Sequence, residues 1–174
     1  KQVGAAGLNN FLRGLDNQPS WTTPTAVYSQ CGQDSGYSAS RARDGSTSTE
    51  WRHSTTENHW IILDMGQTRD ISRIQIYQSS TASYRWGQSS GIEVYVSDNP
   101  SSWGSVVWTG TLDASGWQQS GTFSATGRYV RLRSLSTSSS QRLYEVQVQT
   151  NNPGYDASDT QWLTADIREQ LQFT

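Results

Sequence analysis

The segment Ala42-Arg43-Asp44-Gly45-Ser46-Thr47-Ser48-Thr49-Glu50-Trp51 carries more structural information than any other part of this 174-residue sequence. Asp44-Gly45 inside a polar run is a turn signal. The Asp44 carboxylate stands among hydroxyl and carbonyl oxygens, which are the donors that hard cations prefer. By itself the segment leaves two interpretations open, a cation-binding loop or an ordinary solvated turn.

Alternation of apolar and polar residues recurs in the sequence that follows. Ile74 and Ile76 alternate with polar neighbours, and Ile92, Val94 and Val96 repeat the pattern. A period of two is typical of strands with one buried face. We predict strands over residues 60–64, 71–78, 91–97, 106–110, 117–123, 127–134 and 143–149, separated by turn signals such as 65–67. So many short, punctuated strands predict an all-β, antiparallel sandwich or jelly roll of about eight strands.

The two ends of the sequence lack this pattern. Residues 1–20 show only an apolar cluster with helical spacing, so we interpret them as a lead-in that can be helical. In residues 151–174, Ser158 or Asp159 is suited to cap a short helix that packs on the domain. We therefore predict a domain over residues 21–150 with an extension at each end.

Composition excludes several functional classes. The formal net charge is −2 and Lys1 is the only lysine, so the sequence has few cations to neutralise phosphates and does not favour nucleic-acid binding. Apolar runs of four or five residues predict no membrane insertion. The sequence opens at Lys1 without an initiator Met or a signal peptide, and we interpret it as a mature fragment of a longer protein that is secreted, periplasmic or on the cell surface.

Cys31 is the only cysteine, which rules out a disulfide within the chain. A single cysteine is more often a small buried hydrophobic residue than a nucleophile. A nucleophilic Cys needs a base, and neither His53 nor His59 has a diagnostic spacing to Cys31.

Six segments resemble, in order, the motifs of discoidin domains, also called coagulation-factor type C domains, and of family-32 carbohydrate-binding modules. The opening segment is similar to the family's A-x-D-G-x-x-x-T-x-W signature. Residues 58–66, 71–76, 91–97, 127–132 and 144–148 resemble five later motifs, beginning with the W-I-x-x-D-L-G strand and turn. The resemblance covers roughly residues 36–150. It implies an eight-stranded jelly-roll sandwich and a non-catalytic module that recognises sugars, lipids or proteins.

The resemblance also implies a structural Ca²⁺. Carried over residue by residue, Asp44 and Glu145 supply carboxylates and Thr49 supplies its hydroxyl and carbonyl, while Arg41, Ser46 and Tyr144 supply carbonyls. Six or so oxygens with two negative charges suit Ca²⁺ better than Mg²⁺. The alternative is that Asp44 and Glu145 are merely solvated or paired with cations.

No catalytic set is recognisable, whereas two loops suit carbohydrate. In family members the ligand residues come from these loops, so the resemblance points to Tyr84, Arg85, Trp86, Arg52 and His53. Tyr37, Trp103 and Trp108 are further candidates, although the strand pattern around Trp108 favours the core for that residue. An aromatic ring stacks on the apolar face of a pyranose and polar groups read its hydroxyls. Each residue has an alternative: Trp86 in the core, Arg85 in a surface salt bridge, His53 bonded to a loop carbonyl. We assign Trp51 and Trp60 to the core.

The sequence departs from the galactose-binding members of the family. They carry an Arg soon after the 71–76 strand and an Asn-Gly pair in the next loop, where this sequence has Tyr77-Gln78-Ser79-Ser80. We therefore expect a glycan other than simple galactose, with an amino sugar and a uronate both open. The expected function is a carbohydrate-binding module appended to a larger bacterial glycoside hydrolase or surface lipoprotein. The alternative is a structural or protein-interaction module that holds a neighbouring domain.

Overall fold

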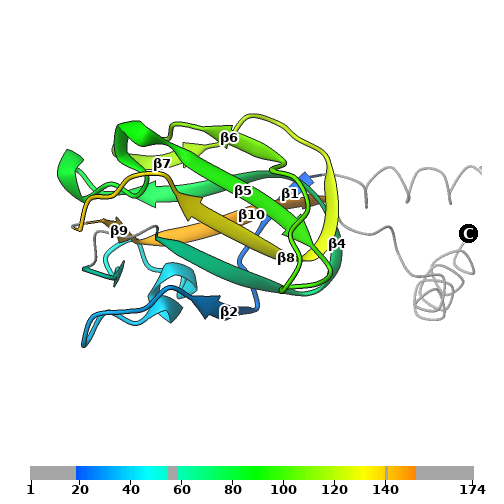
Figure 1. Cartoon of the computed structure of the whole chain (residues 1–174), viewed down its shortest axis with the longest axis horizontal. Helices are drawn as coiled ribbons and strands as arrows, with labels where there is room; N and C mark the ends of the chain where they lie inside the picture. Colours follow the sequence, from blue (N-terminus) through cyan, green and yellow to red (C-terminus); the bar gives the residue numbers. More distant parts are fainter. Residues whose placement is uncertain (1–18, 55–58, 140, 152–174) are drawn as a thin grey trace, which may run out of the picture.

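The computed structural model describes residues 19–54, 59–139 and 141–151. Within them the chain is built from ten strands and three short 3₁₀ turns (Figure 1). The strands are β1 (Pro19–Thr22), β2 (Ala26–Gln30), β3 (Trp51–Arg52), β4 (Trp60–Gln78), β5 (Ile92–Ser97), β6 (Trp108–Gly110), β7 (Gly116–Gln119), β8 (Ala125–Ser134), β9 (Arg142–Leu143) and β10 (Glu145–Asn151). The 3₁₀ turns are η1 (Ala39–Arg43), η2 (Ala82–Tyr84) and η3 (Gln88–Ser90). The helices expected near the two ends fall on residues outside the described ranges.

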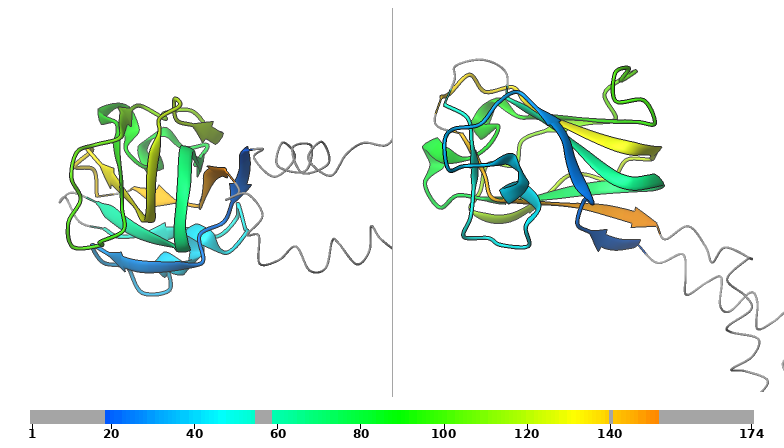
Figure 2. Two further views of the ribbon diagram at one scale, coloured as in Figure 1. Left: turned by 90° about the vertical axis from the view of Figure 1, so that its right-hand side faces the viewer. Right: turned by 90° about the horizontal axis from the view of Figure 1, so that it is seen from below.

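The strands form an antiparallel β-sandwich in which β4 runs through both layers. Its first half pairs with β2 and β8, and β8 continues to β5 and β6. Its second half pairs with β10 and β7, and β10 pairs with β1. β1 and β10 therefore lie side by side at one end of the sandwich (Figure 2). The predicted all-β antiparallel sandwich is confirmed.

The strands predicted at 60–64 and 71–78 are one continuous strand, β4, so the predicted break between them is wrong. The turn signal at Gly66 produces a bulge instead of a break: the register to β8 shifts between Asp64 and Arg69. Gly66 has a φ of +81°, and its N–H donates to Asp64 Oδ1 at 2.7 Å. The extra residues bend β4 from one layer into the other.

Other boundaries also differ from the prediction. The segment expected at 143–149 divides at Tyr144 into β9 and β10, and β7 ends at Gln119. β1 and β2 were not predicted, because short strands with partly exposed residues on both faces lack a period of two. β3 was not predicted because its two residues are too few to show a period.

The core lies between the two layers. Its central side chains have no more than 2% exposure and come from alternate positions of the strands: Ile61, Leu63, Ile71, Ile74, Ile76, Ile92, Val94, Val130, Leu132, Val146 and Val148. Trp51 is in this core at 1% exposure, as predicted. Trp60 is only partly buried, which corrects its assignment: Arg131 Cζ lies 5.5 Å from the centre of its ring. None of the described residues forms a helix long and apolar enough to cross a membrane.

Candidate functional site

A hollow of about 390 Å³ opens at the end of the sandwich where β4 ends and β7 and β10 begin. It is lined by Thr47, Tyr77, Gln78, Ser79, Ser80, Ser115, Gly116 and Tyr144. The lining brings together four segments that are far apart in the sequence, and most of it is hydroxyl and amide groups. Such a surface offers hydrogen-bond donors and acceptors to a polar ligand.

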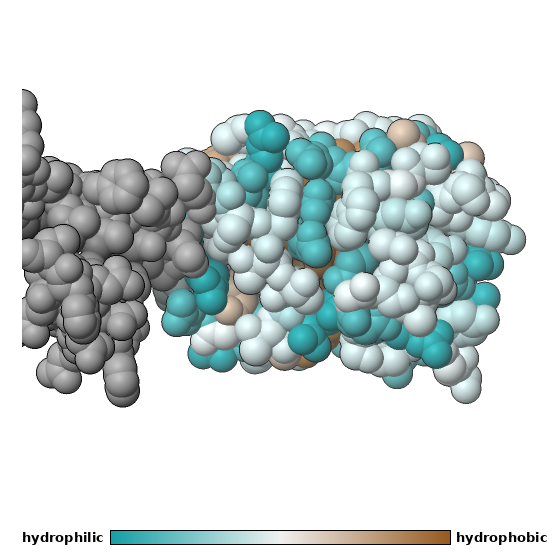
Figure 3. All heavy atoms as spheres, turned by 180° about the vertical axis from the view of Figure 1, so that it is seen from behind, coloured by the Kyte–Doolittle hydropathy of each residue, from teal (hydrophilic) through white to brown (hydrophobic). Residues whose placement is uncertain are grey.

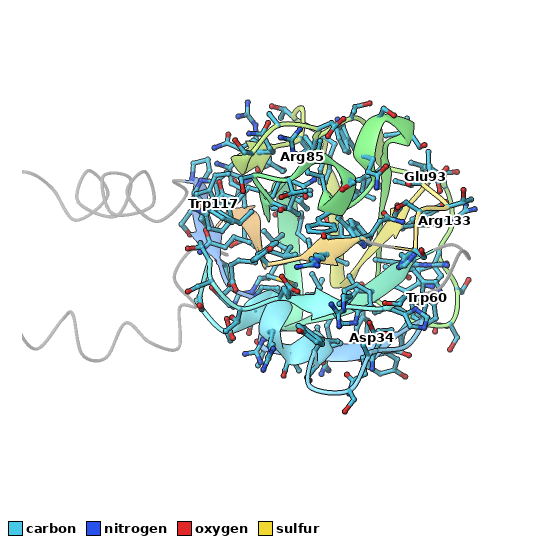
Figure 4. The ribbon with its side chains drawn as sticks, turned by 90° about the vertical axis from the view of Figure 1, so that its left-hand side faces the viewer. Asp34, Trp60, Arg85, Glu93, Trp117 and Arg133 are labelled. Atoms are coloured by element: carbon cyan, nitrogen blue, oxygen red, sulfur yellow. The ribbon has the colours of Figure 1, made fainter. Side chains whose placement is uncertain are left out.

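Two aromatic residues, Tyr77 and Tyr144, line this hollow, and a third, Trp117, contacts Tyr77 beside it. The Tyr77 ring meets the Trp117 ring edge to face, with centroids 5.6 Å apart, and the Tyr144 ring in the same manner at 6.3 Å. Trp117 follows Gly116 of the lining and retains 38% exposure, so part of its ring faces solvent. Among the described residues, the other large hydrophobic side chains this exposed are Tyr28 and Val106. Trp117 and Arg85 are labelled in Figure 4, which looks onto this end.

Arg85 fixes the loop that forms one wall of the hollow. Its guanidinium donates to the carbonyl oxygens of Ser79 and Ser80 and bonds Asp113 through both the carbonyl and the carboxylate. The Arg85–Asp113 ion pair measures 3.2 Å. Most of the hydrogen-bond donors of Arg85 are thus engaged within the protein. This agrees with the alternative stated from the sequence, in which Arg85 forms a salt bridge and does not contact a ligand. Arg85 positions the wall instead of extending toward a ligand.

Trp86 lies in the core, which corrects its assignment as a stacking residue. The side chain is 1% exposed, and its ring packs 6.4 Å from that of Trp51. The loop turns inward because Gln78 and Gln141 hold its backbone: Trp86 N–H donates to Gln78 Oε1 at 2.9 Å, and Gly87 N–H to Gln141 Oε1 at 2.8 Å. A ring enclosed in this way offers no face to a sugar.

Arg142 and Glu50 extend the site beyond the hollow. Arg142 pairs with Glu50 at 3.0 Å and stacks on Tyr84, with its guanidinium carbon 3.7 Å from the ring centre. Burial, followed by the Glu50 carboxylate, raises the pKa of Tyr144, whose hydroxyl also interacts with Ser79 and Arg142. The predicted residue Tyr84 does not line the hollow itself. It contacts Arg142, which in turn interacts with Tyr144 of the lining.

Arg52 and Tyr37 form a second stack on the neighbouring strand. The Arg52 guanidinium carbon lies 3.8 Å from the centre of the Tyr37 ring, and its Nε donates to Asp34 at 2.8 Å. Arg52 pairs with Arg142 in the register of β3 and β9. The two arginine–tyrosine stacks are thus adjacent, and they place Tyr37, Arg52 and Tyr84 on one surface beside the hollow. Trp103 lies elsewhere, 5.9 Å from the guanidinium carbon of Arg131, and Trp108 packs against the core.

His53 is directed away from this surface and toward Cys31. Its Nδ1 lies 3.2 Å from Cys31 Sγ, and its ring is 5.7 Å from that of His59. Cys31 is half-buried, not fully buried. Burial raises the pKa of the Cys31 thiol, which is opposite to the shift that activates a nucleophile.

Asp44, Thr49 and Glu145 come together at the start of β10. Thr49 donates its hydroxyl to Asp44 Oδ2 at 2.7 Å, and the backbone N–H of Gly45 donates to Glu145 Oε2 at 3.2 Å. Glu145 is 1% exposed, and its Oε1 has no hydrogen-bond partner among the described residues. Burial, followed by the nearby Asp44 charge, raises the pKa of Glu145 to about 7. An orphaned carboxylate oxygen beside a second carboxylate fits a hard cation.

The three carbonyl ligands implied by the family stay predictions. Arg41 lies in η1, whose C-terminal neighbour is Asp44. Ser46 donates its N–H to Asp44 Oδ1 at 2.9 Å, and Tyr144 directly precedes Glu145. All three residues are therefore close in sequence to Asp44 or Glu145.

Sequence reasoning missed Tyr77, Trp117, Glu50 and Arg142. Trp117 stands in a stretch that alternates as a strand, and its exposed face follows only from the pairing of β7 at an edge of the sheet. Arg142 and Glu50 are 92 residues apart, and no local pattern links them.

The comparisons with known proteins agree with this architecture. The model of the F5/8 type C domain family matches residues 24–147. The C-terminal domain of a chitobiase from Bacteroides fragilis has a TM-score of 0.66 and 17% identity, over 76% of this chain and 98% of the other. Chitosan-binding module 1 of a chitosanase/glucanase from Paenibacillus sp. IK-5 has a TM-score of 0.54 and 27% identity, over 72% and 94%.

Module 2 of the same Paenibacillus enzyme, solved with chitotriose, has a TM-score of 0.57 and 21% identity, over 72% of this chain and 95% of the other. Among proteins with a curated description, none matches the sequence. The family match runs from before β2 into the first part of β10, and it includes the Asp44 loop and all the residues that line the hollow. The chain belongs to the F5/8 type C (discoidin) domain family, and its structural neighbours are family-32 carbohydrate-binding modules.

Proposed function

We propose that this domain is a non-catalytic carbohydrate-binding module and that the hollow beside Trp117 receives a sugar residue. The observation that carries the proposal is the meeting of the Tyr77, Trp117 and Tyr144 rings at an open hollow with a polar lining. The apolar face of a pyranose stacks on an exposed aromatic ring, while serine, threonine and amide groups satisfy its hydroxyls. Two ion pairs beside the hollow, Arg85–Asp113 and Glu50–Arg142, hold the surrounding segments, which limits the entropy lost on binding.

The ligand class that we propose first is an oligosaccharide of amino sugars. The relative with 27% identity is a chitosan-binding module, and this degree of similarity supports shared ligand chemistry better than the other structural matches reported above. The Glu50 carboxylate near Tyr144 is the acidic group best placed to meet an ammonium or amide group of such a sugar. A uronate would instead approach Arg142, so the two ligand classes depend on different members of one ion pair.

We also propose that Asp44, Thr49 and Glu145 hold a structural Ca²⁺, with carbonyl oxygens from Arg41, Ser46 and Tyr144. The orphaned Oε1 of Glu145 supports this assignment. When bound, the ion supplies positive charge that neutralises the exposed Asp44 carboxylate and the buried Glu145 carboxylate, and it performs no chemistry on a ligand. Thr47 lies in the loop between Asp44 and Thr49, and both Thr47 and Tyr144 line the hollow. Ordering this loop therefore orders two walls of the sugar site.

We further propose that the domain serves as an accessory module of a larger secreted or surface protein, such as a bacterial glycoside hydrolase. The face seen in Figure 3 is largely polar, with apolar residues confined to small separate spots, so this face gives no support to an apolar protein-docking role. The structural-module alternative becomes the conclusion if no glycan binds.

Isothermal titration with chitotriose, an alginate oligosaccharide and galactose tests the sugar site. We expect chitotriose to bind, and we expect Trp117→Ala to abolish binding. Tyr28→Ala is the matched control, because Tyr28 is also an exposed aromatic residue, at 52%, but it contacts Tyr129 and lies on β2, away from the hollow. Binding that survives Trp117→Ala unchanged would place the sugar elsewhere, and no binding of any glycan would overturn the proposal.

A further inference from the structure

Cys31, His53 and His59 form a compact cluster on the opposite side of β3 from the arginine–tyrosine stacks. One potential ligand atom of each residue lies within 4.8 Å of the other two, and Cys31 Sγ is 3.2 Å from His53 Nδ1. The proposed sugar site and the Asp44–Glu145 pair use none of these residues. A thiol and two imidazoles are soft or borderline donors, unlike the oxygens around Asp44.

Three separate backbone segments hold the cluster in place. Cys31 follows β2, and its N–H donates to Trp60 O at 3.1 Å. His59 precedes β4, and its carbonyl accepts from Ser134 N–H at 2.8 Å. His53 follows β3, whose Arg52 carbonyl accepts from Asp34 N–H at 2.8 Å. The three donors are therefore held by the sheet itself, so little chain entropy is lost when an ion binds them.

Gly32 gives the His53 ring the space that it occupies. A Cβ atom at Gly32 would lie 2.4 Å from His53 Nε2 and 2.9 Å from two further ring atoms. The Gly32 carbonyl accepts from Trp51 Nε1 at 2.9 Å, which fixes this backbone against the core. The ring is thus packed so that Nδ1 faces Cys31.

The Cys31 sulfur also accepts a hydrogen bond from Trp60 N–H at 3.4 Å. Backbone N–H donors to sulfur stabilise a thiolate and are common around metal-bound cysteines. In a tetrahedral zinc site the bond lengths place sulfur and nitrogen donors about 3.3–3.8 Å apart. The cluster is within about 1 Å of that spacing, so small side-chain rotations suffice to complete it.

We propose that Cys31, His53 and His59 form a binding site for a late first-row transition metal ion, with Zn²⁺ as the probe. As the zinc–sulfur bond forms, the thiol proton leaves to solvent, and the ion gains one thiolate and two neutral imidazoles. Cys31 and His53 are half-buried and His59 is 1% exposed, so the fourth position of the ion faces the solvent side of the cluster. Bound to residues that precede β4 and follow β2 and β3, the ion links β2 and β4 of one layer to β3, the strand that carries Arg52.

The test is a titration of the metal-free protein with Zn²⁺, followed by Co²⁺ substitution to record the thiolate-to-metal charge-transfer absorption. We expect one equivalent of Zn²⁺ to bind and the Co²⁺ form to show thiolate absorption. Cys31→Ser should remove the absorption, and His53→Gln should weaken Zn²⁺ binding at least about tenfold. Asp44→Ala should leave both readouts unchanged, because Asp44 belongs to the other proposed metal site. No bound Zn²⁺, or binding that neither Cys31→Ser nor His53→Gln weakens, would overturn the proposal.

Thiol reactivity gives a second readout that does not depend on an absorption band. Bound Zn²⁺ should slow the modification of Cys31 by a thiol reagent, and His53→Gln should remove that protection at the same Zn²⁺ concentration. Equal modification rates with and without Zn²⁺ in the parent protein would count against Cys31 as a ligand.

Discussion

The backbone N–H of Gly45 donates a hydrogen bond to Glu145 Oε2 at 3.2 Å, which joins two residues 100 positions apart in the sequence. The contact ties the loop after η1 to the first residue of β10, and it leaves Oε1 of the same carboxylate without a partner among the described residues. One carboxylate thus links an early loop to the last strand of the sandwich.

Calcium should raise the thermal stability of this domain. An ion at one hundred times its dissociation constant adds about 2.7 kcal/mol. Each kcal/mol corresponds to about 2–4 °C in a domain of this size, so chelation should lower Tm by several degrees and calcium should restore it. Scanning calorimetry with and without a chelator measures the shift.

Glu145→Gln is the sharpest variant for this test. It removes the charge and keeps an oxygen for the Gly45 bond, so the domain should fold while losing most of the calcium-dependent shift in Tm. Glu93→Gln serves as the control, because Glu93 pairs with Arg133 at 3.0 Å on another part of the surface, where the two residues lie together in Figure 4. A calcium shift equal in Glu145→Gln and the parent would refute the assignment.

Trp117→Ala should weaken glycan binding at least about tenfold, which corresponds to about 1.4 kcal/mol, and leave Tm nearly unchanged. The reason is that the Trp117 ring is partly exposed and contacts Tyr77 at its edge, so its removal leaves no buried cavity. Titration calorimetry gives the affinity, and a thermal scan shows whether the fold is intact. A loss of stability as large as the loss of affinity would indicate a structural role for Trp117.

Arg85→Ala should weaken binding through the wall of the hollow. Its guanidinium holds the carbonyl groups of Ser79 and Ser80 against Asp113. Without it the wall becomes mobile, so both affinity and the protection of nearby amides from hydrogen exchange should fall. Arg85→Lys retains the charge but not the forked geometry, and it should recover only part of either property. Weaker binding with unchanged amide protection would instead assign Arg85 a direct contact.

Acid should destabilise the domain partly through Asp64. Arg128 donates two hydrogen bonds to this carboxylate, both at 2.8 Å, and they are the largest influence that holds the pKa of Asp64 below its ordinary value. The unfolded chain therefore takes up this proton first, so the stabilisation is complete above the unfolded pKa of about 3.9 and is lost as pH falls through the lower folded pKa.

Asp64→Asn should reduce this acid-dependent loss of stability, as measured by denaturant unfolding between neutral pH and the acid range. Asp70→Asn is the control, since Asp70 accepts from the Thr126 hydroxyl at 2.7 Å and not from an arginine. An unchanged acid dependence in Asp64→Asn would show that other carboxylates account for it.

Gly127→Ala should destabilise the sandwich by about 1–3 kcal/mol. A Cβ at this position would lie 2.8 Å from the Ser97 carbonyl carbon and 2.9 Å from its nitrogen, and the backbone of β5 has no room to move away. Ser124→Ala, at an exposed position just before β8, provides the reference for an alanine substitution nearby. Chemical denaturation compares the two, and equal stabilities would mean that β5 and β8 can separate without cost.

Much of the fold follows from the sequence because apolar and polar residues alternate in parts of the central strands. Ile74, Ile76, Ile92 and Val94 are all fully buried, as a period of two requires. The edges are different: β1 and β2 have partly exposed residues on both faces, so their sequences carry no such period. The bend of β4 at Gly66 was interpreted as a turn, because a bulge and a turn use the same residues.

The candidate site was harder to predict because its contacts are non-local. Tyr84, Arg52 and Tyr37 lie on the predicted surface, yet Trp86 turns into the core. Its loop is held by Gln78, eight residues before Trp86, and by Gln141, which is far away in the sequence. An aromatic residue next to an arginine in a polar loop has the same local sequence whether its ring points outward or inward. The bonds from the two glutamines decide the direction, and no pattern around Trp86 contains them.

The pairing of β1 with β10 has a mechanical consequence. Pro19, the first residue of β1, lies opposite Asn151, the last residue of β10, so the first and last described residues of the chain lie side by side. At about 3.4 Å per residue, the start of β10 beside the hollow is roughly 20 Å from that pair. Tension applied between these two residues acts across the β1–β10 ladder at its open end. The hydrogen bonds of the ladder would break sequentially from that end, while the far end of the sandwich carried little of the applied force.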